Sequence, residues 1–109
     1  MKAVYLIKEG SNNYYKIGVS KDVNSRIKQL QTGSAGSIEF YYEFYSEYSY
    51  KIEKALHRHH KFNNISGEWF DLTREQVDGF LDTCQKYENN IKATDKTKNP
   101  HYNEYKRRV

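Results

Sequence analysis

Two short runs of β-forming residues open the chain, with a turn-forming segment between them. The first run extends from Ala3 to Lys8 and the second from Tyr14 to Val19. Residues 9–13, with the sequence Glu-Gly-Ser-Asn-Asn, have the composition of a turn. This pattern predicts an antiparallel β-hairpin at the N-terminus, on which the later elements must pack.

The segment after the hairpin changes to a helical period. Ser20 is the predicted N-cap, and one apolar stripe then follows at i, i+4 and i+7, formed by Val23, Ile27 and Leu30. Residues 31–37 contain two glycines and end this helix. Residues 38–45 are rich in aromatic side chains and predict a third strand.

Two more helices are predicted in the second half of the chain. Ser46 or Ser49 caps the first of them, whose buried face is expected to hold Tyr48, Ile52, Ala55, Leu56 and Phe62. A short extended segment follows at residues 68–72. Thr73 and Gln76 have the spacing of a capping box, and the inner face of the next helix, to about residue 87, is marked by Val77, Phe80, Leu81 and Cys84.

This order of elements predicts the fold class. It favours a small α/β domain of the α+β type, in which a three-stranded, mostly antiparallel sheet is flanked by three helices.

The positive charge of the chain is concentrated at its C-terminal end. Residues 1–88 carry 12 Lys or Arg and 12 Asp or Glu, whereas residues 89–109 carry 6 and 2, so the net charge of +4 comes from the second segment. We therefore predict a folded domain over residues 1–88 and a basic polar tail over residues 89–109. Such a tail fits a nucleic acid partner, because it releases counterions from phosphates, and it equally fits a solubilising terminus.

Length, hydropathy and cysteine content exclude several classes of protein. A chain of 109 residues favours one domain. No apolar run approaches the roughly 20 residues that a membrane span needs, and the N-terminus is charged too soon for a signal peptide. We therefore expect an intracellular protein with no membrane partner. Cys84 is the only cysteine, which excludes an internal disulfide and a cysteine-based zinc site.

Four motifs and one arginine stand in a fixed order along residues 3–72. They are Val4-Tyr5-Leu6-Ile7, Tyr15-Lys16-Ile17-Gly18-Val19-Ser20, Arg26, Ile52-Glu53-Lys54-Ala55-Leu56-His57 and Gly67-Glu68-Trp69-Phe70. Together they resemble the GIY-YIG nuclease superfamily, and most closely its branch with a T5orf172 domain. Three positions depart from the family pattern. The first motif lacks its glycine, Lys16 stands at the usual tyrosine of the second motif, and Leu30 replaces a frequent His or Tyr.

The resemblance implies a metal-dependent endonuclease that hydrolyses phosphodiester bonds in nucleic acid, with DNA favoured over RNA. Tyr5 would act as the general base for water. Lys16, facing it across the hairpin, would stabilise the phenolate. Arg26 would stabilise the charge of the transition state. Glu53 would hold one Mg²⁺ or Mn²⁺ ion. Lys16 shares a strand face with Gly18, whose missing side chain is expected to leave room for the substrate backbone.

Further contacts with nucleic acid are expected from Tyr15, His57, Asn64, Lys106, Arg107 and Arg108. The proposed catalytic residues also have purely structural explanations. Tyr5 would form a cross-strand pair, Arg26 would be a solvated helix charge, and Glu53 would form an i, i+4 pair with His57. Two other functions stay open at this point. One is a nucleic-acid-binding module without catalysis, and the other is a protein-interaction adaptor that uses the aromatic residues at positions 40–45.

Overall fold

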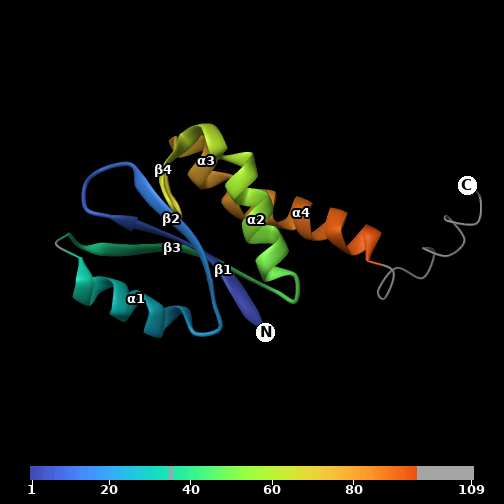
Figure 1. Ribbon diagram of the computed structural model, residues 1–109, viewed down its shortest axis with the longest axis horizontal. Helices are drawn as coiled ribbons and strands as arrows, with labels where there is room; N and C mark the ends of the chain where they lie inside the picture. Colours follow the sequence, from blue (N-terminus) through green and yellow to red (C-terminus); the bar gives the residue numbers. More distant parts are fainter. Residues whose placement is uncertain (35, 96–109) are drawn as a thin grey trace, which may run out of the picture.

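The computed structural model describes residues 1–34 and 36–95. Along the chain, the elements are β1 (Lys2–Glu9), β2 (Tyr14–Ser20), α1 (Val23–Gly33), β3 (Ile38–Ser46), α2 (Ser49–His59), the 3₁₀ helix η1 (Lys61–Asn63), β4 (Asn64–Ser66), β5 (Trp69–Asp71), α3 (Arg74–Asp78) and α4 (Phe80–Thr94) (Figure 1). The predicted contacts of Lys106, Arg107 and Arg108 with nucleic acid fall outside the described residues.

The strands form one antiparallel sheet in the order β3-β1-β2-β5-β4. The α+β class and the antiparallel pairing are confirmed, but the predicted number of three strands is wrong, because the sheet has five. The additional strands β4 and β5 have three residues each, which is too short to show an alternating hydrophobic pattern. Gly67 turns the chain between them with a positive φ of 54°, a conformation that glycine adopts without strain.

The hairpin register fixes which side chains share a face of the sheet. Tyr5 stands opposite Gly18, and Ile7 stands opposite Lys16. Opposite residues of an antiparallel pair point to the same side, and successive residues alternate. The residues of one face are therefore Tyr5, Ile7, Lys16 and Gly18. Leu6 and its partner Ile17 belong to the other face.

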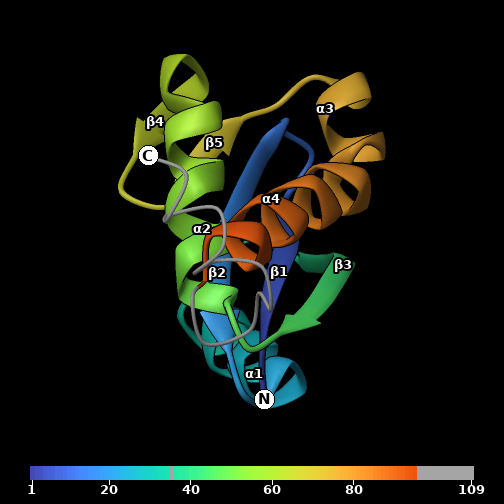
Figure 2. The same cartoon turned by 90° about the vertical axis from the view of Figure 1, so that its right-hand side faces the viewer.

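The larger core lies on the face covered by α2 and α4, which we call the core face (Figures 1 and 2). Its buried residues are Val4, Leu6, Tyr15, Ile17, Tyr48, Ile52, Leu56, Phe70, Leu72, Val77, Phe80 and Cys84. Two residues expected in this core are solvent-exposed: Phe62 is 92% exposed and Leu81 is 39% exposed. Phe62 lies outside because α2 ends at His59, so the helical period used to place it no longer applies.

The opposite face is covered by α1 and holds a smaller cluster, so we call it the α1 face. Its buried residues are Ala3, Tyr5, Ile7 and Val23, with Ile27, Leu30 and Ile38 packed against them. The stripe of α1 predicted from the sequence is therefore confirmed, although only Val23 of this helix is fully buried.

The helix ends partly follow the predictions. The capping box of Thr73 and Gln76 is confirmed. Asp22, not Ser20, caps α1, because its carboxylate accepts from the Ser25 N–H. Neither predicted serine caps α2, whose N-cap is Tyr48.

The last predicted helix is divided at Gly79 into α3 and α4, and α4 continues past residue 87 to Thr94. Helix α4 therefore continues through residue 88, where the sequence predicts the boundary between the folded domain and the tail. That boundary stays a prediction. Ile91 packs against the core, and the Tyr48 hydroxyl donates a 2.8 Å bond to Asp95. No helix in residues 1–34 and 36–95 is long and apolar enough to cross a membrane.

Candidate functional site

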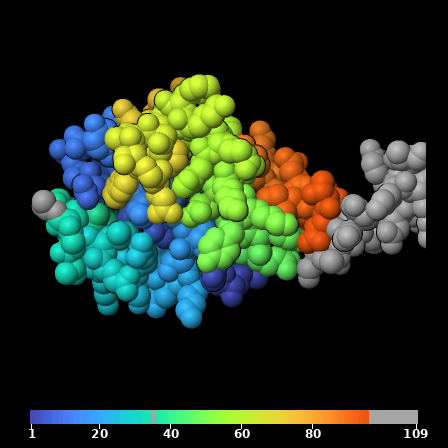
Figure 3. Space-filling view, viewed as in Figure 1, coloured from blue at the N-terminus to red at the C-terminus, as the bar shows by residue number. Residues whose placement is uncertain are grey.

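The candidate site lies along the outer edge of β2, between α1 and α2. β5 pairs with β2 over residues 14–16, and one further bond joins the Ile17 N–H to the Glu68 carbonyl. Because β5 has only three residues, it leaves the rest of this edge free of a neighbouring strand. Figure 3 shows residues in the colour range of β2 at the surface between α1 and α2.

Tyr5 reaches this edge because Gly18 has no side chain. A Cβ added at Gly18 would lie 2.5 Å from the Tyr5 hydroxyl oxygen, so the phenol occupies the space of the missing side chain. Tyr5 is 1% exposed, and only the tip of its ring approaches the free part of β2. The expectation that Gly18 leaves room for a substrate backbone is therefore wrong, because the phenol fills that room.

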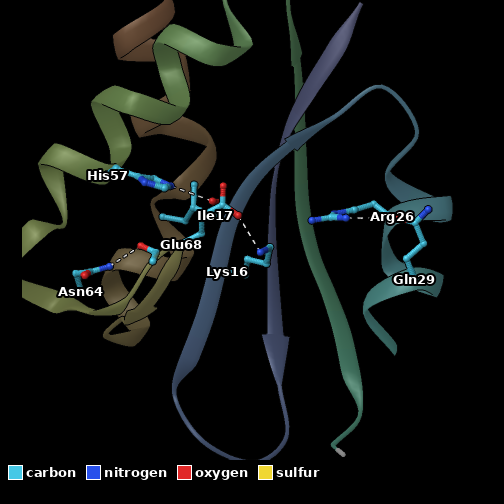
Figure 4. A network of polar contacts seen from close by, with 8 residues as sticks. Lys16, Ile17, Arg26, Gln29, His57, Asn64 and Glu68 are labelled. Atoms are coloured by element: carbon cyan, nitrogen blue, oxygen red, sulfur yellow. Dashed lines mark hydrogen bonds and ion pairs between the residues drawn. The ribbon is translucent and has the colours of Figure 1, made fainter. Parts of the chain in front are cut away.

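Lys16 is buried and held by an ion pair. Its Nζ lies 2.8 Å from Oε2 of Glu68 and 5.7 Å from the centroid of the Trp69 ring (Figure 4). Its expected position directly across from Tyr5 is wrong, since Ile7 is the residue opposite Lys16. Tyr5 and Lys16 instead lie diagonally on the α1 face, a spacing that long side chains can span.

Arg26 approaches the sheet from α1. Its Nη1 donates a 3.3 Å hydrogen bond to the Gln29 side chain, and Figure 4 shows the side chain extending from α1 toward the strands. The side chain is half-buried and forms no ion pair within the described part of the chain. Its guanidinium therefore keeps donors that can bind a phosphate.

Glu53 approaches the same edge from α2, on the side opposite Arg26. It is half-buried, and burial raises the pKa of its carboxyl group, with a further contribution from the negative charge of Glu68. His57, Lys16 and Lys54 oppose this shift. Mutual influence of this kind requires proximity, so Glu53 shares one electrostatic environment with the Lys16–Glu68 pair.

His57 and Asn64 make structural contacts near the site. The His57 Nε2–H donates to the Ile17 carbonyl at 3.0 Å, and its ring packs edge-on against Phe70. The Asn64 amide donates to the carbonyls of Gly67 and Trp69, which fixes the turn that carries Glu68. Both residues therefore hold the backbone of the site, and their contacts with nucleic acid stay predictions.

Tyr15 lies on the core face, away from Tyr5. Burial raises the pKa of its hydroxyl to about 12, and the neighbouring Tyr41 adds to the shift. The two rings meet edge-on with centroids 5.3 Å apart. A phenol that stays protonated at neutral pH is a poor candidate for the general base, which argues against Tyr15 in that role.

Glu68 is the residue of this site whose role was not predicted from the sequence. It belonged there only to a closing motif, Gly67-Glu68-Trp69-Phe70. The one indication in the sequence is its place between a turn-forming glycine and a buried aromatic segment, which holds its side chain at a fixed point. Its ion-pair partner, Lys16, lies about fifty positions away along the chain and could not be identified without the sheet register.

The donor chemistry of the site is compatible with a magnesium-type cation. No group of three or more His, Cys, Asp or Glu side chains in residues 1–34 and 36–95 could enclose a metal ion. Mg²⁺ is commonly held by one or two carboxylates together with water and substrate phosphate, so it does not need such a cage. The carboxyl group of Glu53, whose charged form is disfavoured by burial and by Glu68, would gain from a bound cation.

These features define a class of protein: a small α+β domain with helices on both faces of an antiparallel sheet and a charged site at the sheet edge. The sequence model of the T5orf172 domain matches residues 2–85, and the chain belongs to this family. The family is associated with a nuclease-like fold and points to a role connected with nucleic acid. No curated protein and no solved structure is significantly similar to the chain.

Proposed function

We propose that the protein is a metal-dependent endonuclease of the GIY-YIG type, which hydrolyses phosphodiester bonds in nucleic acid, with DNA favoured over RNA. Support comes from the elements that surround the edge of β2, each of which carries one of four chemically different groups, and from the influence of Lys16 and Glu68 on the carboxyl group of Glu53. A phenol arrives from β1, an ammonium from β2, a guanidinium from α1 and a half-buried carboxylate from α2. Membership of the T5orf172 family also supports a function connected with nucleic acid.

The four side chains would have separate roles in the reaction. Tyr5 would accept the proton of the attacking water, a contribution of about 10²–10⁴ in rate. Arg26 would bind a non-bridging oxygen and stabilise the charge that grows there. Glu53 would hold Mg²⁺ or Mn²⁺, which when bound neutralises the leaving oxygen.

Glu68 would position the Lys16 ammonium group for its role in the reaction. The ion pair at 2.8 Å fixes the ammonium at the sheet edge and offsets part of its charge. A buried lysine without a partner is costly, so the ion pair with Glu68 holds the Lys16 side chain in place. In this arrangement Glu68 is a positioning residue, and Lys16 supplies the positive field beside Tyr5.

The proposal is tested by cleavage of labelled single- and double-stranded DNA and RNA, with Mg²⁺, with Mn²⁺ and with EDTA. We expect cleavage only with a cation, and Glu53→Gln to lower the rate at least about 100-fold. The matched control is Glu39→Gln, which neutralises an exposed carboxylate on β3 and should retain the wild-type rate.

Stability separates lost chemistry from a lost fold. The charged form of Glu53 is disfavoured in the folded protein, so Glu53→Gln should leave the melting temperature unchanged or raise it. Mg²⁺ should raise the melting temperature of the wild type more than that of Glu53→Gln. Full activity in Glu53→Gln would refute the proposed role of this residue. Binding without cleavage by the wild type would favour the non-catalytic module instead.

A further inference from the structure

The charges of the folded domain are unevenly distributed, although residues 1–88 sum to zero. The segment formed by α2 and η1 carries a single acid, Glu53, and four basic side chains, which are Lys51, Lys54, Arg58 and Lys61. By contrast, β3 carries Glu39 and Glu43 and no Lys or Arg. The neutral sum therefore conceals a basic surface on one helix.

Three of these basic residues line a groove between α2 and α4. Lys51, Lys54 and Arg58 are spaced so that they share one face of α2. Tyr87 and Ile91 of α4 form the other wall, and the groove has a volume of about 260 Å³. Figures 1 and 2 both show α4 beside α2. A groove with cations on one wall and an aromatic ring on the other suits a polyanion that also carries flat apolar groups.

The groove has an acidic end and a basic end. Glu47, Glu88 and Asp95 all act on the hydroxyl of Tyr48, so these acids lie near the first turn of α2. Arg58 and Lys61 lie at the other end of the helix, and neither forms a salt bridge among the described residues. The attraction for phosphate is therefore strongest at the C-terminal end of α2.

An exposed aromatic ring lies at this basic end. Phe62, in η1, is 92% exposed, the most exposed of the large apolar side chains in the described chain. Its ring lies beside Lys61, whose Nζ is 5.0 Å from the ring centroid. Because a Phe in this position contributes almost nothing to the core, its ring is available for a flat partner. An unpaired nucleobase offers such a partner, whereas the bases of a duplex are already stacked.

We propose that the outer face of α2 and η1 binds a single-stranded polynucleotide, with Lys54, Arg58 and Lys61 on phosphates and Phe62 stacked on an unpaired base. Glu53 lies on α2, whose C-cap is His60, directly before η1. At a rise of 1.5 Å per residue, Glu53 is roughly 10 Å along the helix axis from this C-cap. An unpaired strand held here would pass close to the candidate site. The inference rests on the proposed function for the identity of the partner as nucleic acid, but it concerns binding and not cleavage.

The test measures binding in EDTA, so that cleavage cannot contribute. Fluorescence anisotropy would follow the full-length protein on a labelled oligodeoxynucleotide, an oligoribonucleotide of the same sequence and a blunt DNA duplex. We expect Phe62→Ala to weaken binding to the single strands about tenfold and to change duplex binding less than twofold. Phe40→Ala, which removes a half-exposed ring from β3, is the matched control and should bind as the wild type does.

A second pair of variants tests the phosphate contacts. Lys54→Ala with Arg58→Ala should flatten the logarithmic salt dependence of single-strand binding by about 1.4, since each lost contact removes about 0.7. Arg74→Ala with Lys86→Ala removes the same charge from exposed positions on α3 and α4 and should leave the slope unchanged.

The outcomes separate this inference from the proposed catalytic function. If the protein does not cleave but Phe62→Ala still loses single-strand binding, the endonuclease proposal fails and the binding surface stands. Equal losses for Phe62→Ala and Phe40→Ala, equal salt slopes for the two double variants, or no binding of any strand by the wild type would each overturn the inference. The deoxy and ribo strands together show whether the surface distinguishes the sugar.

Discussion

The two faces of the sheet are built from different kinds of residue. On the core face, β1 and β2 contribute Val4, Leu6 and Ile17, and α2 and α4 close over them with aliphatic and aromatic side chains. On the α1 face, the same two strands contribute a phenol, a lysine and a glycine beside the buried Ala3 and Ile7. Thus one hairpin supplies the larger apolar core on one side and a smaller core with polar side chains at its edge on the other.

The covering helices differ in the same way. Four residues of α2 are buried, whereas only Val23 of α1 is. Proteins depart from well-packed apolar interiors mainly at functional sites, where other requirements compete with stability. The difference indicates that the core face contributes more to stability than the α1 face, on which the register places Tyr5 and Lys16.

The largest expected effect on stability comes from truncating a buried side chain of the core face. Ile52→Ala removes a fully buried side chain and should lower the free energy of unfolding by about 2–5 kcal/mol. The matched change on the other face, Ile27→Ala, affects a half-buried side chain and should lower it by about 1 kcal/mol. Urea unfolding of both variants measures the two values. Equal losses would mean that the faces do not differ in stability.

The core face should also make stability depend on pH. His60 is 4% exposed, and burial lowers its pKa to about 4. Below pH 6.5 the unfolded chain gains a proton that the folded one does not, so stability falls from about pH 6.5 to about pH 4, by as much as about 3 kcal/mol. In His60→Gln, urea unfolding at a series of pH values should show a shallower fall. The same slope as in wild type would contradict this account of His60.

Residues 96–109, the last part of the predicted tail, give the smallest expected effect on stability. Because Tyr48 bonds to Asp95 and Ile91 packs on the core, we expect a chain ending at residue 95 to keep its melting temperature within about 2 °C, the effect of a few tenths of a kcal/mol. The removed segment holds five Lys or Arg and one acid, so nucleic acid binding should weaken at low salt and depend less on salt. Unchanged binding would show that the tail makes no phosphate contact.

Much of the core face could be predicted from the sequence, because periodicity carries the information. The spacing of Ile52, Ala55 and Leu56 marks a helix face wherever that helix packs. The prediction failed where the period ended, at Phe62, and at β4, which is too short to have one. β5 lies within the extended segment expected at residues 68–72, but its pairing with β2 was not predicted. The division of the last helix at Gly79 was not predicted, because the apolar period continues across it.

The candidate site was less accessible to such reasoning, because its geometry depends on pairing between distant segments. Tyr5, Lys16, Arg26 and Glu53 were named from a resemblance, and their periodicity alone does not distinguish them from surface residues. That the Tyr5 ring lies over Gly18, and that Lys16 pairs with Glu68, follows only from the register of β1 with β2 and of β2 with β5. A shift of register by one residue would move both side chains to the other face.

The most direct test of the contrast between the two faces compares Tyr5→Phe with Tyr15→Phe, which remove one hydroxyl from each face of the same hairpin. Single-turnover cleavage with Mg²⁺ and the melting temperature would be measured on both. We predict that Tyr5→Phe is slower by about 10²–10⁴ with little change in melting temperature. Tyr15→Phe should keep its rate within about threefold and lose at most about 1 kcal/mol of stability. Equal losses of rate, or a larger loss in Tyr15→Phe, would contradict the assignment of the reaction to the α1 face.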